Sequence, residues 1–307
     1  MADAYTGTSA MAGVVKAAYD RYVEFALRSQ PMMRDLVTKR PVQQAMPGSS
    51  VVFSLYQDLA DATSALTETT DPDSVAISNV TQVTVTLAEY GNVVLNTRLL
   101  GETSFADVDP GVANLIAFNL ASSIDALVTA TASGGTNVEY SGNATSTGTV
   151  DAADTLGGAD VRKVVAKLRA ANAVPKSGSL YAAYTHPETA HDLRGETGAL
   201  AFEDIRKYTG PENILNGVTG VLGGAYFVET SRVKTATDGA SSAKVYRTIV
   251  CGDQSIAEAV AVEPNVVIGE VVDKLKRFRP MGWYALMGHA RYREDALYRI
   301  ESGSSIA

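Results

Sequence analysis

The chain has 307 residues, of which 46% are hydrophobic and 20% are charged, and its net charge is -8. This balance is typical of a soluble globular protein with one large core or two linked ones. The single cysteine, Cys251, excludes an internal disulfide framework, and the first residues lack the basic and apolar regions of a signal peptide, so we expect folding in a reducing cytosol. No stretch reaches the ~18 uninterrupted apolar residues of a membrane span.

The charge is distributed unevenly along the chain. Residues 41–161 contain 14 acidic residues and one base, Arg98, whereas residues 1–40 carry a net charge of +2 and residues 162–307 one of +3. Solubility alone explains an acidic surface. The alternative is head-to-tail association, in which the acidic middle segment of one copy meets the basic parts of the next.

The N-terminal region predicts an arm. Apolar residues recur at helical spacing from Ser9 to Ser29, and Pro31 follows the end of this helix. Met32 to Gln44 is expected to be extended or irregular, with prolines at its end.

Residues 51–98 predict a projecting tongue. An apolar run from Val51 to Leu59 and an alternating run from Thr81 to Thr97 indicate two strands, and the polar stretch between them has no clear period. Connections of that length inside compact domains are uncommon and usually functional. From Pro41 to Thr97 there is no Lys or Arg. The acidic residues of this region are Asp58, Asp61, Glu68, Asp71, Asp73 and Glu89. An acidic tongue with an apolar base is suited to lie on another surface.

A long helix should follow the tongue. Asp109-Pro110-Gly111 is a good helix start, because the carboxylate can cap free amides and proline suits the first helical position. An apolar stripe runs from Val112 to about Ala132, which corresponds to a rod of roughly 34 Å. Asp125 is its only charge, so we expect a sheet to cover this helix.

The next segment predicts a transition between domains and a third helix. Ser133 to Gly158 is rich in small polar residues, and Ala159 to Asn172 has helical spacing. Its inward positions are Val161, Val164, Val165 and Leu168, and its outward positions are Arg162, Lys163, Lys167 and Arg169.

The C-terminal half predicts alternating strands and short helices, ending in a strand-rich tail. Short helices are expected from His186 to Leu193 and over Leu200 to Tyr208. Strands are expected at 180–185, 225–233, 244–251, 255–263, 266–272, 275–279, 281–293 and 296–300. Basic residues concentrate in the tail: Lys274, Lys276, Arg277, Arg279, Arg291, Arg293 and Arg299.

Motifs for catalysis, cofactors or metals are missing from the sequence. There is no P-loop, dinucleotide-binding glycine motif or nucleophile elbow. The spacing of His186 and His191 differs from zinc-protease patterns, and His289 is expected in the core or at a sheet edge. Asp107 and Asp109 start like a calcium loop without its final glutamate, so helix capping is the better interpretation. We therefore predict no catalytic, cofactor-binding or metal-binding residues.

Two further features have simple interpretations. The basic cluster from Lys274 to Arg279 could touch nucleic-acid phosphates, but acidic flanking residues favour a solvated or protein-contacting face. Cys251 ends an apolar strand and Trp283 lies within another, so both are expected in the core.

The order of these parts resembles the major capsid proteins of tailed bacteriophages with the Hong Kong 97-type fold. The local matches are Arg40-Pro41-Val42, Pro47 to Phe53, Ala62 to Glu68, Tyr181 to Pro187, Gly282 to Ala285 and Leu297 to Ile300. The resemblance covers nearly the whole chain and implies an α+β fold with an N-terminal arm, an extended β-hairpin loop, a spine helix with a peripheral sheet, and an axial domain. The implied boundaries are arm 1–47, extended loop 48–100, peripheral domain 101–157, axial domain 158–260, and late strands 261–307 that return to both domains.

The resemblance also implies a function and partners. The chain would be a non-enzymatic coat protein that self-assembles into hexamers and pentamers of an icosahedral shell around phage double-stranded DNA. It would assemble in the host cytoplasm, away from membranes, and contact DNA non-specifically at most. Because the tongue begins at residue 51, no fused scaffolding segment is expected, and a separate scaffolding protein, a portal and an optional decoration protein would be the partners. Some family members crosslink a loop lysine to a neighbour's asparagine, a reaction that the lysine-free tongue cannot perform.

In such a shell, the acidic tongue of one subunit is expected to contact basic surface of the next. The candidate contact residues are Asp58, Asp61, Glu68, Asp71 and Asp73 on the tongue, and Arg162, Lys163, Lys167, Arg169, Lys274, Lys276, Arg277 and Arg279 opposite them. The alternatives are an encapsulin-like nanocompartment shell, which would need a cargo-peptide groove near the N-terminal helix, an enzyme with an inserted loop, and a β-rich adhesion or tail protein.

Overall fold

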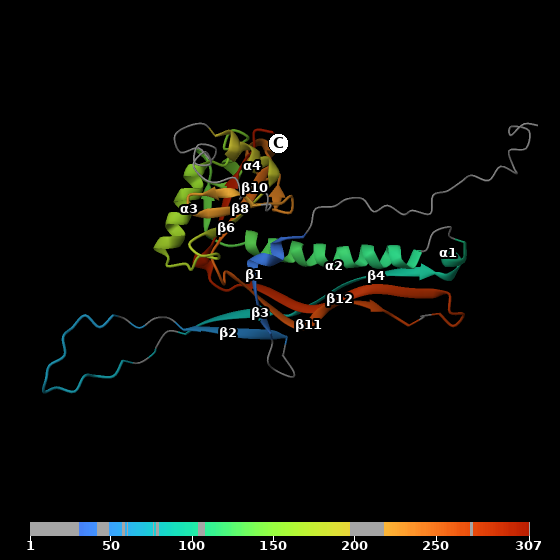
Figure 1. The fold of residues 1–307 in the computed structure, drawn as a ribbon, viewed down its shortest axis with the longest axis horizontal. Coiled ribbons are helices and arrows are strands. Elements are labelled where there is room, and N and C mark those ends of the chain that lie inside the picture. Colours follow the sequence, from blue (N-terminus) through green and yellow to red (C-terminus); the bar gives the residue numbers. More distant parts are fainter. Residues whose placement is uncertain are drawn as a thin grey trace, which may run out of the picture.

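A computed structural model describes residues 31–41, 49–56, 59, 61–75, 77, 80–103, 108–196, 218–270 and 273–306. Their strands form three sheets, which contain four, seven and two strands. Two of the sheets belong to the body of the molecule, and the third is a ribbon that projects from it (Figure 1).

The four-stranded sheet lies beneath a long helix (Figure 1). Its strand order is β1 (Val37–Pro41), β11 (Ile256–Ile268), β12 (Phe278–Arg291) and β4 (Ala88–Thr97), with β1 parallel to β11 and the other pairs antiparallel. The helix, α2 (Val108–Ser133), packs on this sheet mainly through β12. Alternate β12 residues are buried toward α2, namely Met281, Trp283, Ala285 and Met287.

The predicted spine helix is therefore present and covered by a sheet, as expected from its single charge. Ile116, Ile124 and Val128 of α2 belong to the core, and Trp283 Nε1 donates a hydrogen bond to Asn119 Oδ1 at 2.8 Å. Residues Gly111–Ser133 are long and apolar enough to cross a membrane by length and composition. One face of α2 packs on the four-stranded sheet and contributes to the core.

The seven-stranded sheet forms a second layered part of the molecule. Its order is β5 (Val138–Tyr140), β13 (Leu297–Ser302), β10 (Val245–Cys251), β6 (Tyr181–Thr185), β8 (Ala225–Glu229) and β7 (Val218–Leu222), and β9 (Thr235–Ala236) pairs with β10. The predicted inward residues of α3 (Gly158–Ala170) are all buried. They pack with Phe227 and Ile300 in the hydrophobic core of this seven-stranded sheet. His186 caps α4 (Pro187–Gly195) by accepting the Glu188 backbone N–H, and Pro187 occupies the first turn.

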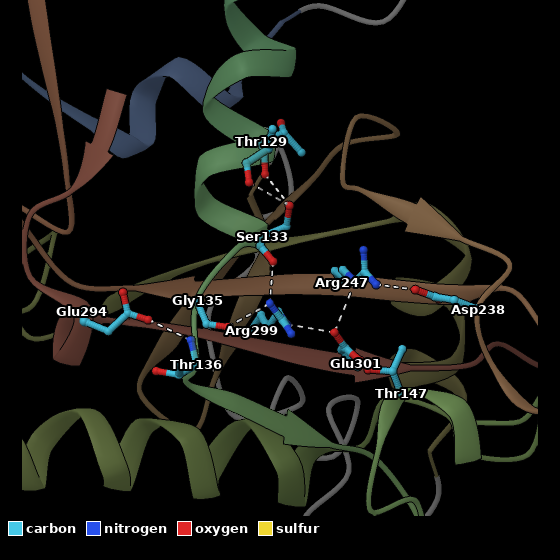
Figure 2. Close-up of polar contacts among 11 residues, drawn as sticks. Thr129, Ser133, Gly135, Thr136, Thr147, Asp238, Arg247, Glu294, Arg299 and Glu301 are labelled. Carbon is cyan, nitrogen blue, oxygen red and sulfur yellow. Dashed lines mark hydrogen bonds and ion pairs between the residues drawn. The ribbon is translucent and has the colours of Figure 1, made fainter. Parts of the chain in front are cut away.

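A buried polar network joins the end of α2 to this sheet, as Figure 2 shows. Arg299 of β13 donates from Nη1 to the carbonyl oxygens of Ser133 and Gly135 at 2.6 and 3.1 Å. Its Nε lies 2.8 Å from Glu301, a fully buried carboxylate that also accepts hydrogen bonds from Arg247 and Thr147. The network thus links α2, β10 and β13.

The tongue has a different strand arrangement from the predicted one. β2 (Ser50–Tyr56) pairs with β3 (Val80–Thr86), and after Leu87 the chain enters β4, a strand of the other sheet. The predicted run Thr81–Thr97 is therefore two strands. A short helix, α1 (Arg98–Thr103), follows β4.

Other predicted boundaries also change. Met32–Gln44, expected to be irregular, contains the 3-10 helix η1 (Met33–Leu36) and strand β1, whose partner β11 lies more than 200 residues away in sequence. The predicted strands 255–263 and 266–272 form a single strand, β11, and residues 275–277 lie in a turn in which Lys276 has a φ of 56°. Among the described residues, further 3-10 helices are η2 (Thr147–Thr149), η4 (Ala240–Ser242) and η5 (Glu294–Ala296). The predicted helices 9–29 and 200–208 lie outside the described residues.

Candidate functional site: subunit-contact surfaces

The tip of the tongue, residues 61–75, is exposed along its whole length. Leu66 and Val75 are 77% and 73% exposed. The four predicted contact acids Asp61, Glu68, Asp71 and Asp73 are exposed, and none forms an ion pair with any part of the chain that the structure describes. Asp58 lies outside the described residues.

The base of the tongue, in contrast, is fixed to the body. Alternate residues of β2 and β3 are covered, and Val85 and Leu87 form a small core with Ala259 of β11. Phe53 also makes an edge-to-face contact with Tyr292 at a centroid distance of 6.3 Å. The tongue is therefore anchored at one end and carries uncovered apolar and acidic groups at the other.

The basic face of α3 is engaged within the chain. Lys167 Nζ donates to Glu139 Oε2 at 2.6 Å, and Lys163 pairs with the other carboxylate oxygen. Burial of Glu139 raises its pKa, but the hydrogen bonds from Lys163 and Lys167 outweigh burial and leave the pKa below its usual value. The predicted role of these lysines in contacting a neighbour stays a prediction.

Arg162 and Arg169 lie over the turn between β7 and β8. Gly223 and Gly224 have φ values of 61° and 95°, and a Cβ on either would fall 2.8 Å from the arginine side chain above it. Glycine suits this turn, because other residues rarely adopt these φ values and a side chain would crowd the arginine above it.

The basic turn, residues 273–279, covers the end of the β11–β12 connection and the first two residues of β12, and it is the more accessible positive surface. Lys274, Lys276, Arg277 and Arg279 are exposed, and Arg277 Nε pairs with Asp273 at 2.5 Å. Among described residues, no acid pairs with Lys274 or Lys276. The backbone N–H of Arg98, the first residue after β4, donates to the Arg277 carbonyl at 2.7 Å, so the turn borders the edge strand of the sheet.

An apolar depression lies beside this turn. This sheet groove has a volume of about 310 Å³, and six of its lining residues are Gly91, Val93, Val267, Gly269, Pro280 and Gly282. Val93 and Val267 are 61% and 43% exposed. A Cβ on Gly282 would lie 2.5 Å from the Asn92 carbonyl oxygen, so this position has no room for a side chain.

The titratable residues that the sequence analysis considered lie in buried ion-pair clusters, in the core or on the surface. His289 lies with Glu258 and Arg34 in a buried cluster, and Arg34 Nη2 donates to Glu258 Oε1 at 2.6 Å. Burial raises the pKa of the Cys251 thiol to about 12, and the side chain of His191 is exposed. Trp283 is in the core as predicted. No group of three or more His, Cys, Asp or Glu among the described residues is arranged to hold a metal ion.

An anchored tongue, a spine helix on a four-stranded sheet and a second layered sheet define the Hong Kong 97-type fold of viral shell proteins. A family profile described as phage capsid protein matches residues 13–303, and the chain belongs to this family. It is a major capsid protein, a structural subunit that associates with itself in the icosahedral shell of the virion.

Solved structures with the same fold include three phage capsids. The capsid of Cyanophage Pam1 has a TM-score of 0.77 at 16% identity, covering 99% of this chain and 100% of the other. The capsid of Cyanophage P-SCSP1u has a TM-score of 0.74 at 16% identity, covering 98% and 96%. The acidic stable capsid of Helicobacter pylori bacteriophage KHP30 has a TM-score of 0.74 at 14% identity, covering 98% and 99%. Among curated proteins, none matches the sequence.

Proposed function

We propose that the chain builds hexamers and pentamers of the shell by laying its tongue across a neighbouring copy. The observation that carries this proposal is the contrast between the anchored base of the tongue and its fully exposed tip. In the part of one subunit that the structure describes, the tip side chains Leu66 and Val75 are 77% and 73% exposed. A second copy supplies such a cover.

Both apolar and charged groups of the tip support association. Complete burial of a leucine side chain contributes about 1.5–3 kcal/mol, whereas an exposed ion pair contributes ~0–1 kcal/mol. The apolar residues would therefore supply most of the affinity, and the acids would select a basic partner and orient the contact. Because the contact is repeated around a closed shell, even a small free energy of association per copy becomes decisive for assembly.

Deletion of residues 61–78 tests the proposal. Because no described residue of this segment belongs to the hydrophobic clusters of the body, the deletion variant should keep the circular dichroism spectrum and unfolding midpoint of the parent chain. Electron microscopy should show no shells. Normal shells from the deletion variant would contradict the proposal.

Charge reversal distinguishes the effect of the acidic residues on assembly from the effect of the rest of the tip. The triple variant Glu68→Lys, Asp71→Lys, Asp73→Lys should stay soluble and folded but fail to assemble at ordinary salt. Replacement of the same residues by Gln or Asn should weaken assembly less, since it removes attraction without adding repulsion. Asp295→Lys, at an exposed acid outside the tongue, is the control and should assemble normally.

The remaining expected properties belong to the same proposal. The shell would assemble in the host cytoplasm and enclose double-stranded DNA that the chain contacts non-specifically, and nuclease-resistant DNA in purified particles would support this. We also propose that the chain has a structural role and no catalytic activity. The observation that supports this is that its buried charged side chains pair with one another and thereby stabilise the fold. The separate scaffolding protein, the portal and the decoration protein stay predictions.

A further inference from the structure

We infer that the cluster of Arg34, Glu258 and His289 is a pH-sensitive switch, which holds η1 and β1 on the four-stranded sheet at neutral pH and loosens them in mild acid. Glu258 pairs with Arg34 in the neutral state and with His289 in the acid state. The three residues come from η1, β11 and β12, so an exchange of partners changes how one element is attached to the other two.

At neutral pH the carboxylate of Glu258 attaches η1 to the sheet. Arg34 donates from Nη2 to Glu258 Oε1 at 2.6 Å and from Nε to Glu258 Oε2 at 3.3 Å, so one guanidinium binds both oxygens. The side chain of Glu258 is fully buried, whereas that of Arg34 is 30% exposed. The arginine can therefore leave the pair and enter water, but the carboxylate cannot.

His289 lies next to the same carboxylate without binding it. Its Nε2 is 3.9 Å from Glu258 Oε2, which is beyond hydrogen-bond distance, and among the described residues this buried nitrogen has no hydrogen-bond partner. The two residues are register partners on β11 and β12, which keeps them side by side. A protonated imidazole carries an N–H on both ring nitrogens, so proton uptake gives His289 a donor next to Oε2.

Proton uptake makes His289 a competitor of Arg34 for one carboxylate. The net charge of the three side chains rises from zero to +1, and an uncompensated charge is costly inside a protein. Because the side chain of His289 is 3% exposed and that of Arg34 is 30% exposed, the arginine is the cation that can move into solvent. Glu258 then pairs with the imidazolium, and η1 loses its ion pair with β11.

Other charged groups border the cluster on the neighbouring elements. Lys39 on β1 is the register partner of the carboxylate, and its side chain is exposed. Arg291, on β12, pairs with Glu294. Asp125 on α2 accepts a backbone hydrogen bond from η1, and β3, which also contacts β12, has no charged residue. The competition for the buried carboxylate is therefore between the arginine and the histidine.

The direction of the pH effect follows from what surrounds His289 in each state. Burial lowers the pKa of His289, Glu258 raises it, and the Arg34 cation lowers it further. When Arg34 leaves, its effect is removed, so the released form binds the proton more tightly than the attached form. Falling pH therefore favours release below about pH 6.5, and the ratio of released to attached form changes by at most about tenfold per pH unit.

The switch acts on the segment that joins residues 1–30 to the sheet. β1 pairs with β11 over five residues and follows η1 directly. The next residue on β11, Ala259, packs instead against Val85 and Leu87 at the base of the tongue. Mild acid should thus loosen the N-terminal attachment and leave the apolar attachment of the tongue in place.

Hydrogen exchange of full-length, unassembled subunits tests the inference. Mass spectrometry would compare residues 33–41 with residues 245–251 of β10 at about pH 7.5 and about pH 5.5, on either side of the ordinary histidine pKa. After correction for the intrinsic effect of pH on exchange, opening of residues 33–41 should increase at the lower pH, by up to about tenfold per pH unit. Residues 245–251, which report on unfolding of the seven-stranded sheet, should not respond.

Three variants identify the groups responsible. His289→Gln should remove the pH response of residues 33–41, and Arg34→Gln should give fast exchange there at both pH values. His191→Gln, at an exposed histidine, is the matched control and should respond like the parent chain. A nuclear magnetic resonance titration adds a direct measurement, because the pKa of His289 should be higher in Arg34→Gln than in the parent.

The outcomes are decisive in both directions. A response confined to residues 33–41 and lost in His289→Gln supports the switch. An equal response in residues 245–251, or an unchanged response in His289→Gln, overturns it. If His289→Gln does not fold, the titration decides: a higher pKa of His289 in Arg34→Gln supports the exchange of partners, and an equal or lower pKa overturns it.

Discussion

Arg299 Nη1 on β13 donates a hydrogen bond of 2.6 Å to the carbonyl oxygen of Ser133 in the last turn of α2. The last carbonyls of a helix have no partners inside the helix, and a cation there also complements the helix dipole. Since the same side chain pairs with the buried Glu301, one arginine fixes the end of the spine helix against the seven-stranded sheet (Figure 2).

Arg299→Met should therefore destabilise the monomer strongly. Removal of Arg299 leaves Arg247 as the cation beside the buried Glu301 and takes the donor away from the Ser133 and Gly135 carbonyls, which should cost about 1–3 kcal/mol. Urea unfolding of unassembled protein measures this loss. Arg277→Met is the control, because its ion pair is exposed and should change stability by no more than about 1 kcal/mol. Equal effects of the two substitutions would contradict the assigned role of Arg299.

Asp125 should anchor the chain segment that enters β1. Its Oδ1 accepts the Met33 backbone N–H at 2.5 Å inside the core. Asp125→Ala leaves that N–H unsatisfied and should lower the free energy of unfolding by about 1–3 kcal/mol. Asp125→Asn keeps an acceptor oxygen and should cost less. Limited proteolysis near residues 31–36 should accelerate in the alanine variant, and an unchanged cleavage rate would argue against the anchor.

Stability should fall in mild acid partly because of His289. Burial lowers the pKa of His289, the carboxylate of Glu258 raises it, and the Arg34 cation lowers it further. Because the folded-state pKa lies below the unfolded value of about 6.5, the unfolded chain takes up the proton first as the pH falls. The contribution of neutral His289 to the free energy of unfolding is therefore complete above pH ~6.5. It is lost below that pH, and the free energy of unfolding falls by at most about 1.4 kcal/mol per pH unit.

His289→Gln should flatten the dependence of unfolding free energy on pH between about 7 and 5. His191→Gln, which replaces an exposed histidine, is the matched control for the histidine-to-glutamine substitution itself. His186, whose pKa is also lowered by burial, remains in both variants and contributes equally. A slope unaffected by His289→Gln would exclude this residue as a source of acid sensitivity.

Two pairs of lysines should respond in opposite ways. Lys163→Met with Lys167→Met removes both partners of the buried Glu139 and should lower the unfolding midpoint of the monomer. Lys274→Glu with Lys276→Glu should keep that midpoint and reduce shell yield, because these side chains are exposed. Light scattering during assembly and thermal unfolding of monomers measure the two effects. Loss of shells from a fully folded first variant would instead assign the contact to α3.

The sequence predicted elements whose residues repeat with a local period. Val161, Val164, Val165 and Leu168 marked the buried face of α3, and the apolar stripe with one charge marked a covered α2. Alternation in the tongue likewise predicted the covered face that contains Val85 and Leu87. These patterns depend on neighbours in sequence, which a single chain displays directly.

Features that depend on distant partners were not predictable in this way. β1 forms because β11 pairs with it in parallel. The run Thr81–Thr97 divides into two strands because β12 pairs only with its second half. The outward spacing of Lys163 and Lys167 gave no indication of Glu139, which lies 24 and 28 residues earlier in the short strand β5. The sheet groove was also missed, since its residues come from three strands; the glycines at 91, 269 and 282 were its only trace in the sequence.

The single residue Leu87 between β3 and β4 has a mechanical consequence. A pull on the tongue passes through the backbone into β4, and β3 and β4 follow one another along the length of the molecule (Figure 1). All ten residues of β4 have register partners on β12, and tension along the strand loads these pairings in shear, so that they resist together. Tension on the tongues of a swelling particle would thus be borne by whole strands of its sheets.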